Sequence, residues 1–122
     1  MLRALTESHP AFAPGWSALG EAFLRIDETD FALEALDRAL ELDPALVETR
    51  LNRARLALYD ERPDDARRDL EQLVDGPRAS EAEVLPAHLV LARLLVEAGE
   101  RQAAETRYAR YLELGGTEAL ED

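Results

Sequence analysis

Apolar residues recur along the chain at the three- and four-residue intervals that are typical of amphipathic helices. Trp16, Leu19 and Phe23, for example, lie at positions i, i+3 and i+7 and would share one face of a helix. Prolines and glycines interrupt the pattern at intervals and indicate helix ends. The pattern predicts an all-helical chain. Its helices are expected near residues 14–26, 30–42, 46–60, 63–75, 85–98 and 101–114.

The same helical pattern occurs three times. Gly20 in the first copy corresponds to Ala54, 34 residues later, and to Ala92, a further 38 residues on. Small residues at this position allow a second helix to approach closely, and large residues fill the space beside the contact. The small residues expected opposite them, on the second helix of each copy, are Ala32, Ala66 and Ala104.

The first copy resembles a tetratricopeptide repeat (TPR), which has the spacing W-x-x-L-G-x-x-aromatic followed by small and large positions and a closing proline. The matching residues are Trp16, Leu19, Gly20, Phe23, Ala32, Leu36, Ala39 and Pro44. The second copy, LNRARLAL, is similar to a bacterial variant of the motif. The resemblance implies an all-α, TPR-like α-solenoid of three stacked helix-turn-helix repeats in a right-handed superhelix.

This spacing predicts the organisation of the chain. We expect the tail of a preceding B helix or an N-terminal cap at 1–12, repeats at 13–46, 47–77 and 85–116, an insertion at 78–84 and an acidic tail at 117–122. The tail is too short for the polar helix that usually caps a solenoid. Tyr108, Tyr111 and Leu112 are therefore expected to face outward. Either the chain belongs to a longer array, or its terminal repeats support self-association.

Arg53 stands where the first and third copies have Leu19 and Leu91, which are expected in the core. A charge at such a position is costly unless it is paired. Asp69 lies sixteen residues later, on the following helix, where it can face Arg53 across the hairpin. We predict a partly buried, structural Arg53–Asp69 ion pair.

In the TPR family, the first (A) helices of the repeats line a concave groove that holds ligands. By position, the resemblance implies a groove formed by Leu51, Asn52, Arg55, Leu58, Tyr59, Leu89, Arg93 and Val96. The implied function is a non-enzymatic scaffold that binds another protein or a peptide in this groove. The alternative is a structural repeat block or oligomerisation module of a larger TPR protein, with no ligand in the groove.

Charge and composition narrow the choice of partner. The formal net charge is −12, and a field of this sign disfavours nucleic acids and anionic membranes. The chain has no cysteine, and its two histidines, His9 and His88, have only acidic residues as possible metal-ligand neighbours. No nucleophile elbow or phosphate-binding loop is present. We therefore expect no catalytic residues, metal site or cofactor.

Because no apolar run has the length of a signal peptide core or membrane span, we expect a soluble, cytoplasmic protein.

Overall fold

The structure, a computed structural model, describes residues 2–76 and 80–121. The helices are α1 (Leu2–Ser8), α2 (Ala13–Arg25), α3 (Thr29–Leu42), α4 (Val47–Tyr59), α5 (Pro63–Asp75), α6 (Leu85–Glu97) and α7 (Arg101–Glu113). No strand occurs within these described ranges. The predicted all-α fold class is confirmed, and the six predicted helices lie within one residue of α2 to α7 at each end. The expected insertion at 78–84 falls partly outside the described residues.

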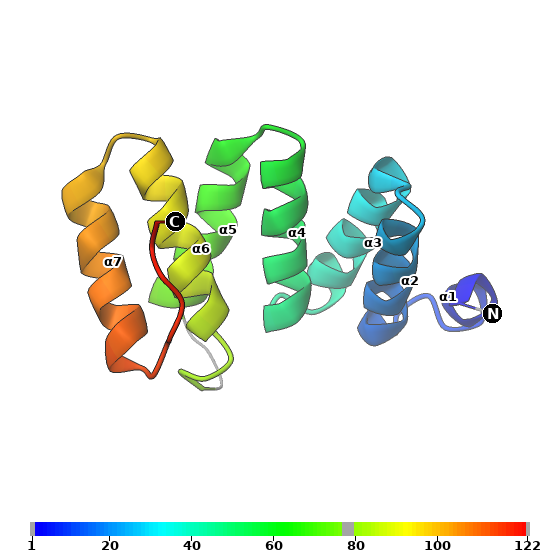
Figure 1. Cartoon of the computed structure of the whole chain (residues 1–122). Coiled ribbons are helices and arrows are strands. Elements are labelled where there is room, and N and C mark those ends of the chain that lie inside the picture. Colours follow the sequence, from blue (N-terminus) through cyan, green and yellow to red (C-terminus); the bar gives the residue numbers. More distant parts are fainter. Residues whose placement is uncertain (1, 77–79, 122) are drawn as a thin grey trace.

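Six of the helices form three antiparallel hairpins that stand in a row: α2 with α3, α4 with α5 and α6 with α7 (Figure 1). Neighbouring hairpins meet through α3 and α4 and through α5 and α6, and α1 packs against α2. Each hairpin thus covers the apolar face that its neighbour cannot bury alone. This is the TPR-like solenoid that the sequence predicts.

Small residues allow the two helices of each hairpin to pack closely. Ala54 and Ala92 on the first helices are fully buried, as are their counterparts on the second helices. At Gly20, an added Cβ atom would lie 2.7 Å from Leu36 Cδ2, and the Leu36 side chain is itself fully buried. A side chain at this position would therefore have to displace Leu36 from the close contact of α2 and α3.

The turn inside each hairpin has the same backbone geometry. Asp27, Glu61 and Gly99 occupy equivalent positions and have φ angles of 60°, 58° and 80°, in the left-handed region. The N–H of the following residue donates to a carbonyl near the end of the first helix, for example from Arg62 to Ala57 at 2.8 Å. This is the geometry of a Schellman helix end, for which glycine is the preferred residue. Only the third hairpin has glycine there.

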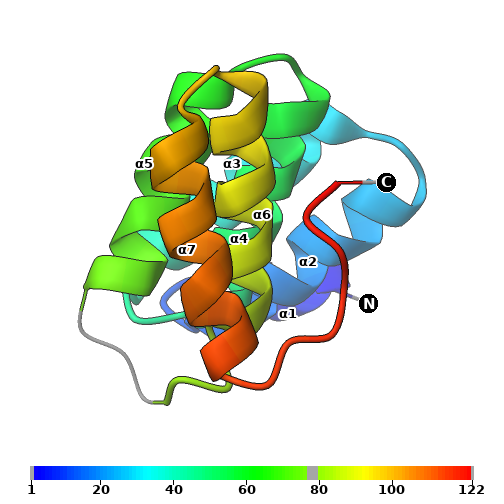
Figure 2. The same ribbon diagram turned by 60° about the vertical axis from the view of Figure 1, so that its left-hand side comes forward.

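The end of the chain differs from what the sequence predicts. After α7, the chain turns at Gly115 (φ 100°) and folds back beside α6, as Figures 1 and 2 both show in red. Tyr111 is only 4% exposed because Gly116 packs against its ring, and Tyr108 is half-buried. The expectation that Tyr111 faces outward is therefore wrong, whereas Leu112 is exposed.

Candidate functional site

A pocket lies between the first helices of the first two hairpins, α2 and α4, and the turn that leads into α3. Its volume is about 290 Å³. The lining residues are Leu24, Asp27, Thr29, Asn52, Arg55, Leu56 and Tyr59. Three of them, Asn52, Arg55 and Tyr59, belong to the groove expected from the sequence. We call this cavity the Arg55 pocket.

The Arg55 pocket combines apolar walls with groups that can bind a charged ligand. Tyr59 is 70% exposed, so most of its ring is available for contact. Arg55 is also exposed, and no carboxylate of the described residues lies within salt-bridge distance of its guanidinium. Asn52 Nδ2 donates to Glu21 Oε1 at 3.5 Å, which is a long hydrogen bond. An incoming carboxylate could therefore reach Arg55 without displacing an internal ion pair.

Four other expected groove residues offer less surface than the sequence suggests. Leu51 and Leu89 are only 5% and 4% exposed, so they offer almost no surface to a ligand, contrary to the expectation that they line the groove. Leu51 belongs to an apolar cluster that the second and third hairpins share, where burial removes its side chain from water. Leu58 and Val96 are half-buried and pack against the same cluster. None of these four side chains lines the Arg55 pocket.

Arg93, the equivalent of Arg55 in the third repeat, has a different environment. Its Nη2 donates to the carbonyl oxygen of Ala119 at 2.7 Å, so the C-terminal segment already uses this side chain. The two arginines therefore do not form one continuous basic surface open to a ligand.

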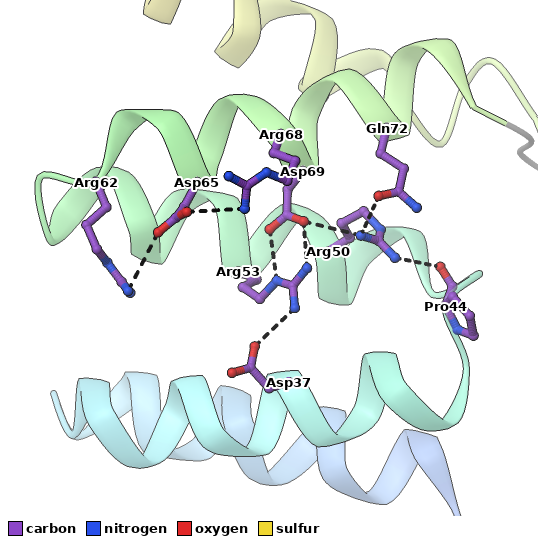
Figure 3. Close-up of polar contacts among 9 residues, drawn as sticks. All are labelled: Asp37, Pro44, Arg50, Arg53, Arg62, Asp65, Arg68, Asp69 and Gln72. Atoms are coloured by element: carbon purple, nitrogen blue, oxygen red, sulfur yellow. Dashed lines mark hydrogen bonds and ion pairs between the residues drawn. The ribbon is translucent and has the colours of Figure 1, made fainter.

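The structure brings Arg53 and Asp69 together in a bidentate contact (Figure 3). Arg53 Nε donates to Asp69 Oδ2 at 2.9 Å, and Nη2 donates to Oδ1 at 2.7 Å. A third nitrogen, Nη1, donates to Asp37 Oδ1 of α3 at 3.0 Å. The Asp69 side chain is 8% exposed and that of Arg53 is 26% exposed. The hydrogen bonds that Arg53 donates to Asp69 raise the pKa of Arg53 above its ordinary value, against the opposing effect of burial.

Arg50 completes this network, and the sequence analysis did not identify it. Its Nη1 donates to Asp69 Oδ1 at 3.2 Å and to Gln72 Oε1 at 3.0 Å, and its Nη2 donates to the Pro44 carbonyl at 3.0 Å. Arg50 lies one helical turn before Arg53, a spacing that could have indicated a shared partner. Because each of these charged groups has a hydrogen-bonded partner of opposite charge, the arrangement fits a structural role. It joins α3, α4 and α5 and so fixes the helix that carries Arg55.

The rest of the described chain offers little that resembles a reactive centre. His88 is buried on α6. Across residues 2–76 and 80–121, no group of three His, Asp or Glu side chains is arranged to hold a metal ion. None of the described helices has both the length and the apolar character to cross a membrane.

Comparison with known proteins identifies the fold. No protein-family model matches the chain, and no curated protein does. Among solved structures, a crystal structure of MamA matches with a TM-score of 0.82 at 20% identity, over 92% of this chain and 63% of MamA. A second MamA structure has a TM-score of 0.79 at 20% identity, over 92% and 59% of the two chains.

A third match is YrrB, described as a TPR protein with an unusual peptide-binding site. Its TM-score is 0.80 at 18% identity, over 94% of this chain and 57% of YrrB. The chain thus spans less than two thirds of the length of each of these structures. Together with the three helical hairpins, the matches show that the chain is a TPR-type protein by fold.

Proposed function

We propose that this chain is a non-enzymatic scaffold that binds a segment of another protein in the groove of its first helices, at the Arg55 pocket. The observation that carries the proposal is an accessible arginine beside an exposed tyrosine in a pocket with leucine walls. Apolar contacts supply most of the affinity in such sites, and a few charged groups fix orientation. The peptide-binding site ascribed to YrrB, which has the same fold, adds support.

The preferred ligand follows from the lining of the pocket. Leu24, Leu56 and the ring of Tyr59 favour apolar side chains, whereas Arg55 can donate two parallel hydrogen bonds to a carboxylate. The best-matched ligand is therefore a short segment with apolar residues and one or two acidic residues. We expect a dissociation constant on the order of 1–100 µM, because a single small pocket buries less area than a standard interface.

The test is a peptide selection on the full chain followed by affinity measurements. Peptides displayed on phage are selected on the wild type, and fluorescence anisotropy then compares wild type with Arg55→Glu. We expect a loss of affinity of at least about tenfold, because the substitution places a carboxylate opposite the ligand's own. The matched control is Arg38→Glu, the same change at an exposed arginine of α3 outside the pocket. If the selected peptides bind Arg55→Glu and Arg38→Glu with equal affinity, the Arg55 pocket is not the peptide-binding site.

The alternative function is a structural repeat block of a larger TPR protein. Two observations favour it: the matched structures are longer than this chain, and the first hairpin exposes Phe12 and Phe31. If no selected peptide distinguishes wild type from Arg55→Glu, this alternative replaces the scaffold proposal.

A further inference from the structure

The C-terminal segment, residues 116–121, lies on the surface of the last hairpin and is held there by side chains of α6 and α7. Most of these contacts go to its backbone. The Tyr111 hydroxyl accepts hydrogen bonds from the N–H groups of Thr117 at 3.2 Å and Glu118 at 3.1 Å. The Tyr108 hydroxyl donates to the Glu118 carbonyl at 2.8 Å. The hairpin therefore contacts the main chain of a segment that bends at Glu118 and Leu120, and these contacts do not involve the side chains of residues 117 and 118.

A third backbone contact comes from the first helix of the hairpin. Arg93 Nη2 donates to the Ala119 carbonyl at 2.7 Å. The main chain of three successive residues, 117 to 119, is thus held by donors and acceptors of the hairpin. Main-chain hydrogen bonds hold a segment whatever its side chains, and contacts to particular side chains supply specificity.

Two further contacts select particular residues of the segment. At Gly116, an added Cβ atom would overlap the ring of Tyr111, so only glycine fits. Five residues later, the Glu121 carboxylate accepts a hydrogen bond from Arg101 Nη2 at 2.5 Å. The bound pattern is a glycine followed, five positions on, by an acidic residue.

The surface that makes these contacts consists of Arg93, Arg101, Tyr108 and Tyr111, which we call the end face. It shares no lining residue with the Arg55 pocket. The segment lies over it with residues 117–119 and 121 exposed to solvent, so it is not part of the core. Its release would uncover Tyr111 without opening the fully buried centres of the hairpins.

We propose that the end face is a second protein-binding surface. It takes a segment of another protein that carries a glycine and, five residues later, an acidic side chain. The chain's own segment 116–121 occupies the face in the absence of that partner. This proposal does not depend on the function of the Arg55 pocket.

Competition between the two segments determines the apparent affinity. A tethered segment with a short linker acts at an effective concentration in the millimolar range, so a free ligand competes poorly while the chain's own segment can bind. Any change that prevents residues 116–121 from binding should therefore increase the affinity for a free ligand.

The experiment uses the full chain and a fluorescein-labelled peptide with the sequence of residues 115–121. Gly116→Ala in the protein prevents its own segment from packing against Tyr111, and we expect it to bind the peptide at least about tenfold more tightly than the wild type does. Adding Arg93→Ala and Arg101→Ala to Gly116→Ala should remove that gain, whereas adding Arg38→Ala should leave it unchanged. Arg55→Glu should also leave it unchanged, which separates this test from that of the Arg55 pocket.

Variants of the peptide test the recognised pattern. Replacing its second glycine with alanine, or its glutamate at the position of Glu121 with glutamine, should weaken binding to the Gly116→Ala protein. A second protein variant, Glu121→Arg, displaces the segment by repulsion from Arg101 without any substitution at Gly116. It should increase peptide binding in the same direction as Gly116→Ala.

Three results would overturn the proposal. The first is equal peptide affinity of the wild type, Gly116→Ala and Glu121→Arg. The second is a peptide affinity that does not change when the glycine or the glutamate of the peptide is replaced. The third is a wild-type dimer in sedimentation that Glu121→Arg dissociates, because it would assign the end face to the C-terminal segment of a second copy.

Discussion

At the scale of single residues, the carboxylate of Asp69 carries a large share of the polar contacts between the two helices of the second hairpin. It accepts hydrogen bonds from Arg50 and twice from Arg53, although its side chain is only 8% exposed. Buried charges are stable in a protein interior only when partners replace the lost water. Both arginines come from α4, so a single side chain of α5 neutralises two charges of that helix.

Replacing Asp69 with alanine should therefore cost about 3 kcal/mol of unfolding free energy, because the positive charges of Arg50 and Arg53 lose their main partner. Urea denaturation followed by circular dichroism measures this cost. The control is Asp65→Ala on the same helix, whose side chain is 48% exposed, and which should cost less than about 1 kcal/mol. Similar costs for the two variants would mean that Asp69 is solvated and its ion pairs contribute little.

At the scale of the elements, the turn inside each hairpin is a repeated feature with unequal sequences. The first two turns place Asp27 and Glu61 in the left-handed region, whereas the third uses Gly99. A residue with a Cβ atom is disfavoured in this conformation, and glycine is not. The first two hairpins thus contain a local strain that the third avoids.

Glu61→Gly should accordingly stabilise the chain by roughly 0.5–1 kcal/mol, since relief of the strain exceeds the extra flexibility of the unfolded chain. Gly99→Ala should destabilise it by about 1 kcal/mol for backbone reasons alone, because a Cβ atom there meets no neighbour within 4 Å. Urea denaturation of both variants provides the comparison. A destabilising Glu61→Gly would show that the glutamate side chain contributes more than its backbone strain costs.

The elements also show how far the sequence alone could lead. The helix bounds and the three hairpins follow from apolar spacing and from small residues such as Ala54, which determine which faces meet. Leu51 and Leu89 could not be placed, because apolar spacing within one helix does not determine how the other helices pack around these two residues. The C-terminal segment could not be placed either. It is held mainly through its backbone, and backbone contacts leave no side-chain pattern in a sequence.

At the scale of the whole molecule, the two ends differ. The last hairpin is covered by its own C-terminal segment, whereas the first exposes Phe31, which is 47% exposed. The Phe31 ring also packs against Phe23 at a centroid distance of 5.4 Å, so the aromatic surface continues into α2. An exposed ring that continues into further aromatic surface tends to find partners. This moves the expected self-association from the last hairpin to the first.

We predict concentration-dependent self-association through the first hairpin, and Phe31→Glu should abolish it by placing a charge in the contact. Sedimentation velocity over a concentration series is the appropriate measurement. Leu112→Glu is the matched control at the other end, where the exposed side chain stands apart, and it should leave association unchanged. A wild type that stays monomeric throughout the series would contradict the prediction.

Binding at the Arg55 pocket can be located residue by residue. A ¹⁵N-labelled sample of the full chain is titrated with the tightest peptide from the phage selection, and amide chemical shifts are followed by NMR. The proposed function predicts that the largest shifts occur at Thr29, Asn52, Arg55 and Tyr59, and that Arg55→Glu abolishes them at the same peptide concentration. Shifts confined to the end face or to the surface around Arg53, with the amides of the pocket unchanged, would contradict it.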